Sequence, residues 1–294
     1  MISFNKFGEY GRFGNQLFQY AFLRTQAKKI GTNFYCPDWL GDRIFCLNDE
    51  SEKGSCVEQK LFYNEGDKNH GYQIEATKIE NNTDIVGYFQ SSRFFSRARV
   101  LKWYTFNEDL FLVTRKKYSH IDFSNSTSIH IRLGDYVKAP LLFYISKPSY
   151  FKQALLILGR RKHILVFSDS PKLAKKYLSF LPQDTIFVEG NKDYEDFYLM
   201  SHCRDMICST STFCWWAAYI NNSENKRVIV PKWLFLPGAP TFNKDLFEVE
   251  GWVQLSAHRF YDNYYIKYIP VQMIKQYNKF LKLVSSKFKI ILNH

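Results

Sequence analysis

From residue 126 onward, β-branched runs alternate with helix-like segments, and this alternation constrains the fold more than any other feature. A strand, a helix and a further strand in succession predict parallel βαβ units. The predicted strands are residues 126–133, 163–170, 184–190, 205–210 and 227–233, and the predicted helices are 171–181, 193–203 and 212–220. Ligands of such sheets bind just past the carboxyl ends of the strands, so functional side chains are expected there.

The N-terminal part shows a weaker form of the same pattern. Leu17, Phe18, Ala21 and Phe22 fall on one face of a predicted helix that ends at Gly31. A short strand is predicted at residues 33–36 and an irregular polar stretch at 41–85. The aromatic-rich segment 87–95 is expected to be packed core, with the lining of a pocket as the alternative. The whole chain therefore predicts an α/β fold.

A chain of 294 residues is long enough for two domains with sizeable cores. The predicted division is an N-terminal α/β domain over 1–124, a Rossmann-like domain over 125–262 and a basic tail over 263–294. No run of about 18 apolar residues appears, so no membrane span is predicted. The N-terminus lacks the layout of a signal peptide, which predicts a cytoplasmic protein with free thiols.

The chain is strongly basic, with a net charge of +12. Such a balance favours phosphates, nucleotides, nucleic acid or an anionic membrane as partners. A composition rich in Lys, Asn, Ile, Phe and Tyr accounts for part of the excess without any partner. The cysteines form no Cys-x-x-Cys pair and the histidines are scattered, so no metal site is expected.

The tail over residues 263–294 holds six lysines and no acidic residue. A helical stripe of apolar side chains runs along it: Met273, Ile274, Tyr277, Phe280, Leu281, Val284, Phe288 and Ile291. This stripe predicts a terminal helix that either lies on a membrane surface or packs on the body with its lysines in water.

Three polar clusters are expected at strand ends or helix starts. The first is the glycine-containing turn Gly11 to Gln16, which leads into a helix and leaves backbone N–H groups free for an anion. Its glycine spacing does not match a dinucleotide fingerprint. Asn15 and Gln16 can bond sugar hydroxyls. Taken alone, the segment fits a purely structural turn equally well.

The second cluster is HIRLGDY, where His130 and Arg132 point to the same face of a strand. An arginine fork can bind phosphate with two hydrogen bonds and keeps its charge. The alternative is a structural pair between Arg132 and Asp135. Asp169, after another strand, is either a ligand of ribose or base or the N-cap of the next helix.

The third cluster is STSTFCWWAAYI, residues 209–220, in which hydroxyl and N–H groups precede a helix. This is a second arrangement suited to an anion. Trp215 and Trp216 are expected in the core. No motif of a serine hydrolase, zinc peptidase or P-loop appears. The clusters therefore suit a leaving group that carries phosphates, held without a metal.

Together, the segments GNQLFQYA, HIRLGDY and STFCWWAA, with FSDS between the last two, resemble glycosyltransferase family 11, the α-1,2-fucosyltransferases. The resemblance covers about residues 8–235. The chain departs from the family pattern at Gly11-Arg12-Phe13-Gly14, which is similar to the protein O-fucosyltransferases, at Thr210-Ser211 and at Cys214.

The resemblance implies a GT-B-like fold, with two Rossmann-like domains facing a cleft. It also implies that L-fucose is transferred from GDP-β-L-fucose to the 2-hydroxyl of a terminal galactose, with inversion and without cofactor or metal. The expected acceptor is a galactose-ended glycan, such as a lipid-linked surface-polysaccharide precursor. The basic tail would suit peripheral contact with the inner face of the plasma membrane.

The resemblance assigns roles to individual residues. Arg132 is expected to stabilise the departing phosphate, and Asp135 either orients Arg132 or, like Glu9, is a candidate base. The expected donor-binding residues are Gly14, Asn15, Gln16, His130, Arg132, Ser168, Asp169, Ser211, Thr212 and Phe213. Arg12 is a candidate second phosphate contact.

Two other classes of function remain open from sequence. One is a fucosyltransferase with another linkage or acceptor, similar to the protein O-fucosyltransferases. The other is a basic α/β protein that binds nucleotides or nucleic acid. The basic residues are spread along the chain and form no known nucleic-acid motif, so no nucleic-acid partner is predicted.

Overall fold

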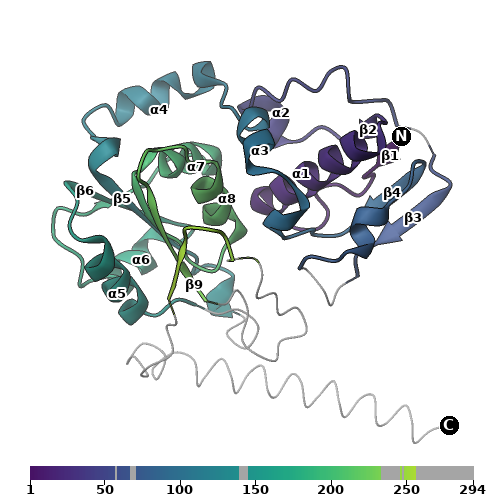
Figure 1. The fold of residues 1–294 in the computed structure, drawn as a ribbon. Helices are drawn as coiled ribbons and strands as arrows, with labels where there is room; N and C mark the ends of the chain where they lie inside the picture. The colour runs from purple at the N-terminus through teal and green to yellow at the C-terminus, as the bar shows by residue number, and fades with distance from the viewer. Residues whose placement is uncertain (57, 67–70, 139–144, 233–245, 247, 256–294) are drawn as a thin grey trace, which may run out of the picture.

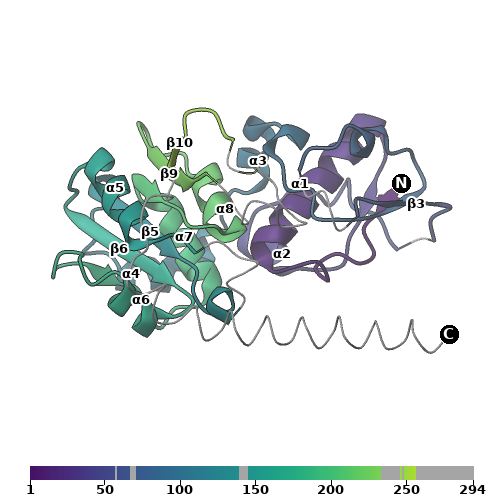
Figure 2. The same cartoon turned by 90° about the horizontal axis from the view of Figure 1, so that it is seen from below.

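The computed structural model describes residues 1–56, 58–66, 71–138, 145–232, 246 and 248–255 (Figure 1). The predicted tail over 263–294 lies outside the described residues, so its membrane contact stays a prediction. Two α/β units lie side by side in both views (Figures 1 and 2). The last strand of the first unit ends at Val86, and the first strand of the second begins at Ser126.

The first unit contains a four-stranded parallel sheet in the order β2-β1-β4-β3. Its strands are β1 Ile2–Ser3, β2 Phe34–Tyr35, β3 Leu61–Asn64 and β4 Thr83–Val86. The expectation of an irregular stretch over 41–85 is wrong for β3, for most of β4 and for a short helix at Leu40–Ile44. Strand β3 lies at the sheet edge with Leu61 and Phe62 largely exposed, so it lacks the alternation of a half-buried strand.

The second unit contains a six-stranded parallel sheet in the order β10-β9-β8-β5-β6-β7. Its strands are β5 Ser126–Ile131, β6 His163–Ser168, β7 Ile186–Phe187, β8 Asp205–Ile207, β9 Arg227–Pro231 and β10 Val253–Leu255. The predicted α/β fold with parallel βαβ units is confirmed. Strand order reverses between β5 and β8, and their carboxyl ends form the switch point at which such sheets bind ligands.

Helices lie around both sheets (Figure 1). They are α1 Phe13–Ile30, α2 Leu40–Ile44, α3 Arg97–Trp103, α4 Leu112–Lys117, α5 Pro148–Leu158, α6 Pro171–Tyr177, α7 Asp193–His202 and α8 Thr212–Ile220. Short 3-10 turns are η1 Glu75–Lys78, η2 Ser92–Phe94, η3 Glu108–Phe111, η4 Phe123–Asn125 and η5 Tyr136–Lys138. Along β5, Ile129 and Ile131 join the core under α5 and α6, so His130 points to the opposite face.

Helices α1 and α8 join the two units through a continuous aromatic core. The ring of Phe18 lies 4.6 Å from that of Trp215 and 4.7 Å from that of Trp216, and all three side chains are buried. The two tryptophans are core residues, as predicted. At the other end of α8, Arg97 donates hydrogen bonds to the carbonyls of Tyr219 and Asn221 at 3.1 and 3.0 Å. The two units are therefore packed together at both ends of α8.

Gly14 allows the first turns of α1 and α8 to meet backbone to backbone. A Cβ atom at this position would lie 2.6 Å from the Phe213 nitrogen and 2.7 Å from the Thr212 carbonyl carbon. Real side chains do not make contacts this short, so any other residue would push the helices apart.

A buried carboxylate holds the turn that follows β4. Glu65 is 6% exposed, and its Oε2 atom accepts hydrogen bonds from the backbone nitrogens of Tyr88 at 2.6 Å and Phe89 at 2.9 Å. Phe89 adopts a φ of +51°, a left-handed conformation that costs free energy for a bulky residue. Burial raises the pKa of Glu65 to about 7, against the lowering effect of the two backbone hydrogen bonds.

We expect Gly14→Ala to destabilise the protein although helix propensity alone favours alanine by about 0.5–1 kcal/mol. Overpacking of this kind costs about 1–3 kcal/mol, so the midpoint of thermal unfolding should fall. Calorimetry of the two purified proteins measures the change. A rise in the midpoint would show that α1 and α8 are not in close contact here.

The titration of Glu65 predicts a pH-dependent stability. The folded-state pKa of Glu65 lies above the unfolded value, so the folded protein holds an extra proton between about pH 4.5 and 7. This proton stabilises the folded state, and its contribution to the free energy of unfolding is lost as the pH rises. Relative to Glu65→Gln, the wild type should lose up to about 3 kcal/mol of unfolding free energy across that window. Urea titrations at several pH values measure the difference. A pH-independent difference would contradict the assignment, and the exposed Glu75→Gln serves as control.

Candidate active site

Side-chain hydrogen bonds link the residues at and just past the carboxyl ends of β5 and β8, at the switch point. His130 of β5 is 6% exposed, and its Nδ1 atom lies 2.8 Å from the Ser209 hydroxyl. The Tyr136 hydroxyl donates to the Thr210 carbonyl at 2.9 Å. These contacts bring the second and third sequence clusters together, as the parallel order of the strands predicts. The contact with Ser209 uses the Nδ1 atom of His130. A contact between His130 and the sugar-nucleotide donor stays a prediction.

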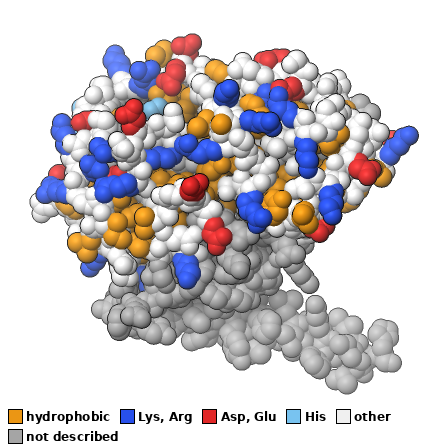
Figure 3. Space-filling view, viewed as in Figure 1, with side chains coloured by type: hydrophobic (Ala, Val, Ile, Leu, Met, Phe, Trp, Pro, Cys, Tyr) orange, Lys and Arg blue, Asp and Glu red, His pale blue; other side chains and the backbone are white. Residues whose placement is uncertain are grey.

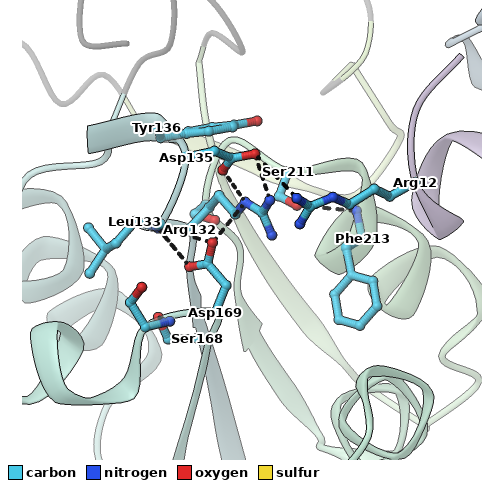
Figure 4. A network of polar contacts seen from close by, with 12 residues as sticks. Arg12, Arg132, Leu133, Asp135, Tyr136, Ser168, Asp169, Ser211 and Phe213 are labelled. Carbon is cyan, nitrogen blue, oxygen red and sulfur yellow. Dashed lines mark hydrogen bonds and ion pairs between the residues drawn. The ribbon is translucent and has the colours of Figure 1, made fainter. Parts of the chain in front are cut away.

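Arg132 lies at the centre of a network of charged groups (Figure 4). Its Nε and Nη2 atoms each donate to an oxygen of Asp135 at 2.9 Å, and Nε also lies 3.1 Å from Asp169 Oδ2. The Nη1 atom has no hydrogen-bond partner among the residues that the structure describes. The side chain is 17% exposed, so this remaining donor is held in place rather than mobile in solvent.

Asp169 braces the loop that carries Arg132. Its Oδ1 atom accepts a hydrogen bond from the Leu133 nitrogen at 2.9 Å, and both of its oxygens lie within 3.2 Å of the Gly134 nitrogen. The N-cap alternative for Asp169 is wrong, because Ser170 occupies the N-cap position of α6. In the structure, Asp169 fixes the loop after β5. A direct contact between Asp169 and the sugar-nucleotide donor stays a prediction.

The pair of Arg132 and Asp135 is electrostatically stable. Burial alone would raise the pKa of Asp135, but the hydrogen bond and charge of Arg132, with a smaller effect of Arg12, hold it below its usual value. For Arg132, burial lowers the pKa, and the contacts with Asp135 and Asp169 outweigh it and raise the pKa. Both groups are therefore charged at neutral pH, and Asp135 is positioned to orient Arg132 rather than to accept a proton.

The first turns of α1 and α8 lie beside this network. Ser211 caps α8, and its hydroxyl accepts a hydrogen bond from the Phe213 nitrogen at 3.3 Å. The Asn15 side chain, in the first turn of α1, accepts a hydrogen bond from the Thr212 hydroxyl at 2.9 Å. Helix N-termini carry a partial positive charge, so two of them at one point favour an anion.

Arg12 reaches this network from the first unit. It occupies the N-cap position of α1, its side chain is 76% exposed, and its Nη2 atom lies 3.9 Å from Asp135 Oδ2. An exposed pair at this distance is worth little energetically. Arg12 is therefore a second cation near Arg132 that is free to move toward a ligand.

The other predicted residues differ in what they offer to a ligand. The Phe213 ring packs on Phe13 and Phe197, so only its backbone remains near the network. The Ser168 hydroxyl accepts a hydrogen bond from the Ser170 nitrogen at 3.1 Å. Gln16 is partly exposed, and Glu9 is exposed with no side-chain hydrogen bond or ion pair in the described part of the chain. A direct role for each of these residues stays a prediction.

Gln90 is the polar residue that sequence reasoning missed. It donates from Nε2 to Asn15 Oδ1 at 2.9 Å and is 5% exposed. It lies in the segment 87–95, whose phenylalanines at 89, 94 and 95 are buried core as predicted. The available signal was a polar glutamine directly after Tyr88 and Phe89 in this aromatic-rich segment.

The arrangement can bind a diphosphate through a fixed guanidinium and two helix N-termini. Among the described residues, no group of three or more His, Cys, Asp or Glu side chains is placed to hold a metal ion. Within the same residues, no helix has the length and apolar character needed to cross a membrane.

Comparisons with known proteins identify relatives of the chain. A model described as Glycosyl transferase family 11 matches residues 5–256. The O-antigen biosynthesis glycosyltransferase WbnK of Escherichia coli is 29% identical over 194 residues, which are 60% of this chain and 62% of WbnK. An α-1,2-colitosyltransferase of Escherichia coli is 27% identical over 257 residues, or 75% of this chain and 89% of that protein. Galactoside 2-α-L-fucosyltransferase SEC1 of Bos taurus is 24% identical over 234 residues, or 71% of this chain and 62% of SEC1.

Solved structures show the same fold at low sequence identity. NodZ α-1,6-fucosyltransferase co-crystallised with GDP matches with a TM-score of 0.50 at 14% identity, over 74% of this chain and 91% of NodZ. POFUT1 in complex with GDP also has a TM-score of 0.50, at 11% identity, over 78% of this chain and 97% of POFUT1. The fold is GT-B-like, as the resemblance implied. Because the family model covers well over half of its residues, the chain belongs to glycosyl transferase family 11.

Proposed function

We propose that this chain transfers L-fucose from GDP-β-L-fucose to the 2-hydroxyl of a terminal galactose on a glycan, with inversion and without a metal. The observation that carries the proposal is the position of Arg132. It lies at the switch point of the second sheet, beside the first turns of α1 and α8, with one nitrogen available. A GDP diphosphate is an anion of the right kind for this place.

The diphosphate of the sugar nucleotide would compete with the Asp135 carboxylate for Arg132. Arg132 and Arg12 are balanced by Asp135 and Asp169, so the cluster has no excess charge of its own. Asp135 is 47% exposed and so can turn toward water, whereas Asp169 is fixed by the loop. A diphosphate that takes the place of Asp135 on Nη2 would also meet Nη1 and the helix N-termini.

The reaction is a single displacement at the anomeric carbon of fucose. The acceptor oxygen forms a bond to this carbon while the bond to the β-phosphate oxygen breaks, and GDP leaves with the electron pair. Arg132 and the N–H groups of the α8 N-terminus would stabilise the charge that develops on the phosphate. Asp135 would orient the guanidinium before the donor binds, and its low pKa makes it a weak base. Glu9 remains the other candidate to accept the hydroxyl proton.

The relatives support the linkage and the acceptor class. The colitosyltransferase and the bovine galactoside fucosyltransferase both carry a 1,2 or 2-linkage in their names. WbnK acts in O-antigen biosynthesis, which supports a polysaccharide precursor as acceptor. The colitosyltransferase relative also favours colitose, which is fucose without its 3-hydroxyl, as a second candidate donor sugar. Placement in the cytoplasm, on the inner face of the membrane, fits such a precursor.

Nucleic acid is the less supported partner. On the face seen in Figure 3, Lys and Arg side chains are interspersed with acidic and apolar ones and form no continuous stripe. Binding to the phosphate backbone of nucleic acid usually needs such a patch.

The test is a transfer assay with defined donors and acceptors. The full-length protein is incubated with GDP-fucose or GDP-colitose and with lactose or other galactosides. GDP release and the linkage of the product are then measured by chromatography and NMR. A 2-linked fucoside formed in the presence of EDTA is the expected product. A product of another linkage, or no transfer to any galactoside, would contradict the proposal.

Arg132→Ala should lower kcat by roughly 10²–10³ because it removes the charge that stabilises the leaving phosphate. Arg160→Ala is the matched control, since Arg160 is 73% exposed and, among the residues that the structure describes, pairs only with Asp184. Circular dichroism and the unfolding midpoint confirm that both variants fold. Near-normal turnover by folded Arg132→Ala protein would remove Arg132 from the mechanism.

A further inference from the structure

The carboxamide of Asn15 is held in one orientation by two donors from different parts of the chain. Its Oδ1 atom accepts hydrogen bonds from Gln90 Nε2 and from the Thr212 hydroxyl, each at 2.9 Å. A carboxamide has one oxygen acceptor and one NH₂ donor group. With the oxygen facing Gln90 and Thr212, the NH₂ group must point the other way.

Gly11 makes room for that NH₂ group. A Cβ atom at Gly11 would lie 1.9 Å from Asn15 Nδ2, and Gly11 has a φ of +99° that other residues avoid. Asn15 Nδ2 has no hydrogen-bond partner among the described residues. In the described part of the chain this donor is therefore unpaired. It lies in the first turn of α1, next to Gly11, and Asn15 is only partly buried.

The turn that carries Gln90 is rigidly held. The carboxylate of Glu65 binds the two backbone nitrogens that precede Gln90, at Tyr88 and Phe89. The Phe89 ring stacks on Phe22 of α1 with 3.8 Å between ring centres and 4° between planes. Gln90 is therefore fixed relative to the same helix that carries Asn15.

We propose that Gln90 is a positioning residue: it locks the Asn15 carboxamide so that Nδ2 donates a hydrogen bond to the diphosphate of the nucleotide. This inference rests on the proposed function, because it takes GDP as the ligand. Gln90 itself lies behind Asn15 and does not touch the nucleotide. Without this lock, the amide can turn over and present its oxygen, which repels a phosphate.

The test is a double-mutant cycle read by GDP binding. Isothermal titration with GDP measures Kd for the wild type, Gln90→Met, Asn15→Ala and the double variant. Asn15→Ala is expected to weaken binding about tenfold or more, and Gln90→Met about fivefold. In the Asn15→Ala background, Gln90→Met should have no further effect, because no amide remains to be positioned. Gln26→Met is the control, because Gln26 is also a buried glutamine but lies about three turns beyond Asn15 in α1. This variant should leave the Kd for GDP unchanged.

A second variant keeps the test decisive if Gln90→Met unfolds. In Gln90→Glu, a protonated carboxyl can still donate to Asn15 Oδ1, whereas an ionised one attracts Nδ2 and reverses the amide. GDP binding by Gln90→Glu should therefore weaken with rising pH more than GDP binding by the wild type does. This extra pH dependence should vanish when Asn15 is also replaced by alanine. Simple repulsion between the introduced carboxylate and the phosphate would persist in that background and would overturn the inference.

The outcomes separate this inference from the proposed function. Additive effects of Gln90→Met and Asn15→Ala on Kd would overturn the positioning role while fucose transfer stands. GDP binding with a coupled cycle but without fucose transfer would support the positioning role and contradict the proposed function. A wild type that does not bind GDP would overturn both.

Discussion

The close contact between α1 and α8 holds the two α/β units together. Gly14 lets the two helices meet at their first turns, and Phe18 packs between Trp215 and Trp216 one turn further on. This packing joins two α/β units into one core and sets two helix N-termini side by side. The same contact places Asn15 of the first unit next to Thr212 of the second. Stability and ligand binding are therefore linked at a single place.

The second sheet supplies the charge at that place. Its strand order reverses between β5 and β8, and Arg132 follows β5 directly. A lone arginine there would be free to adopt many rotamers, at a cost in entropy on binding. Asp135 and Asp169 remove that freedom and orient the guanidinium. The exposed carboxylate of Asp135 can yield to a ligand, whereas Asp169 holds the backbone of the loop.

The sequence predicted the second unit well because local signals there agree with the tertiary structure. The β-branched run at β5, the proline at the start of α6 and the paired tryptophans of α8 each mark their element without help from distant residues. Strand β3 was missed because its exposed edge position leaves no alternation. Helix α5 and strand β10 were also not predicted.

Only part of the site could be predicted from the sequence, because only part of it has a local sequence signal. His130, Arg132 and Asp135 share one short motif, so their grouping follows from strand geometry. The brace from Asp169 depends on β6 lying beside β5, and the bond between Gln90 and Asn15 joins residues that are 75 apart in the chain. Contacts of this kind arise from the packing of elements and leave no local pattern.

A crystal structure of the full chain with GDP would show where the diphosphate binds. We expect the diphosphate to lie within hydrogen-bond distance of the Arg132 guanidinium, between the first turns of α1 and α8, with Asp135 displaced from Nη2. A diphosphate bound away from the carboxyl ends of β5 and β8, with the pair of Arg132 and Asp135 intact, would contradict this expectation.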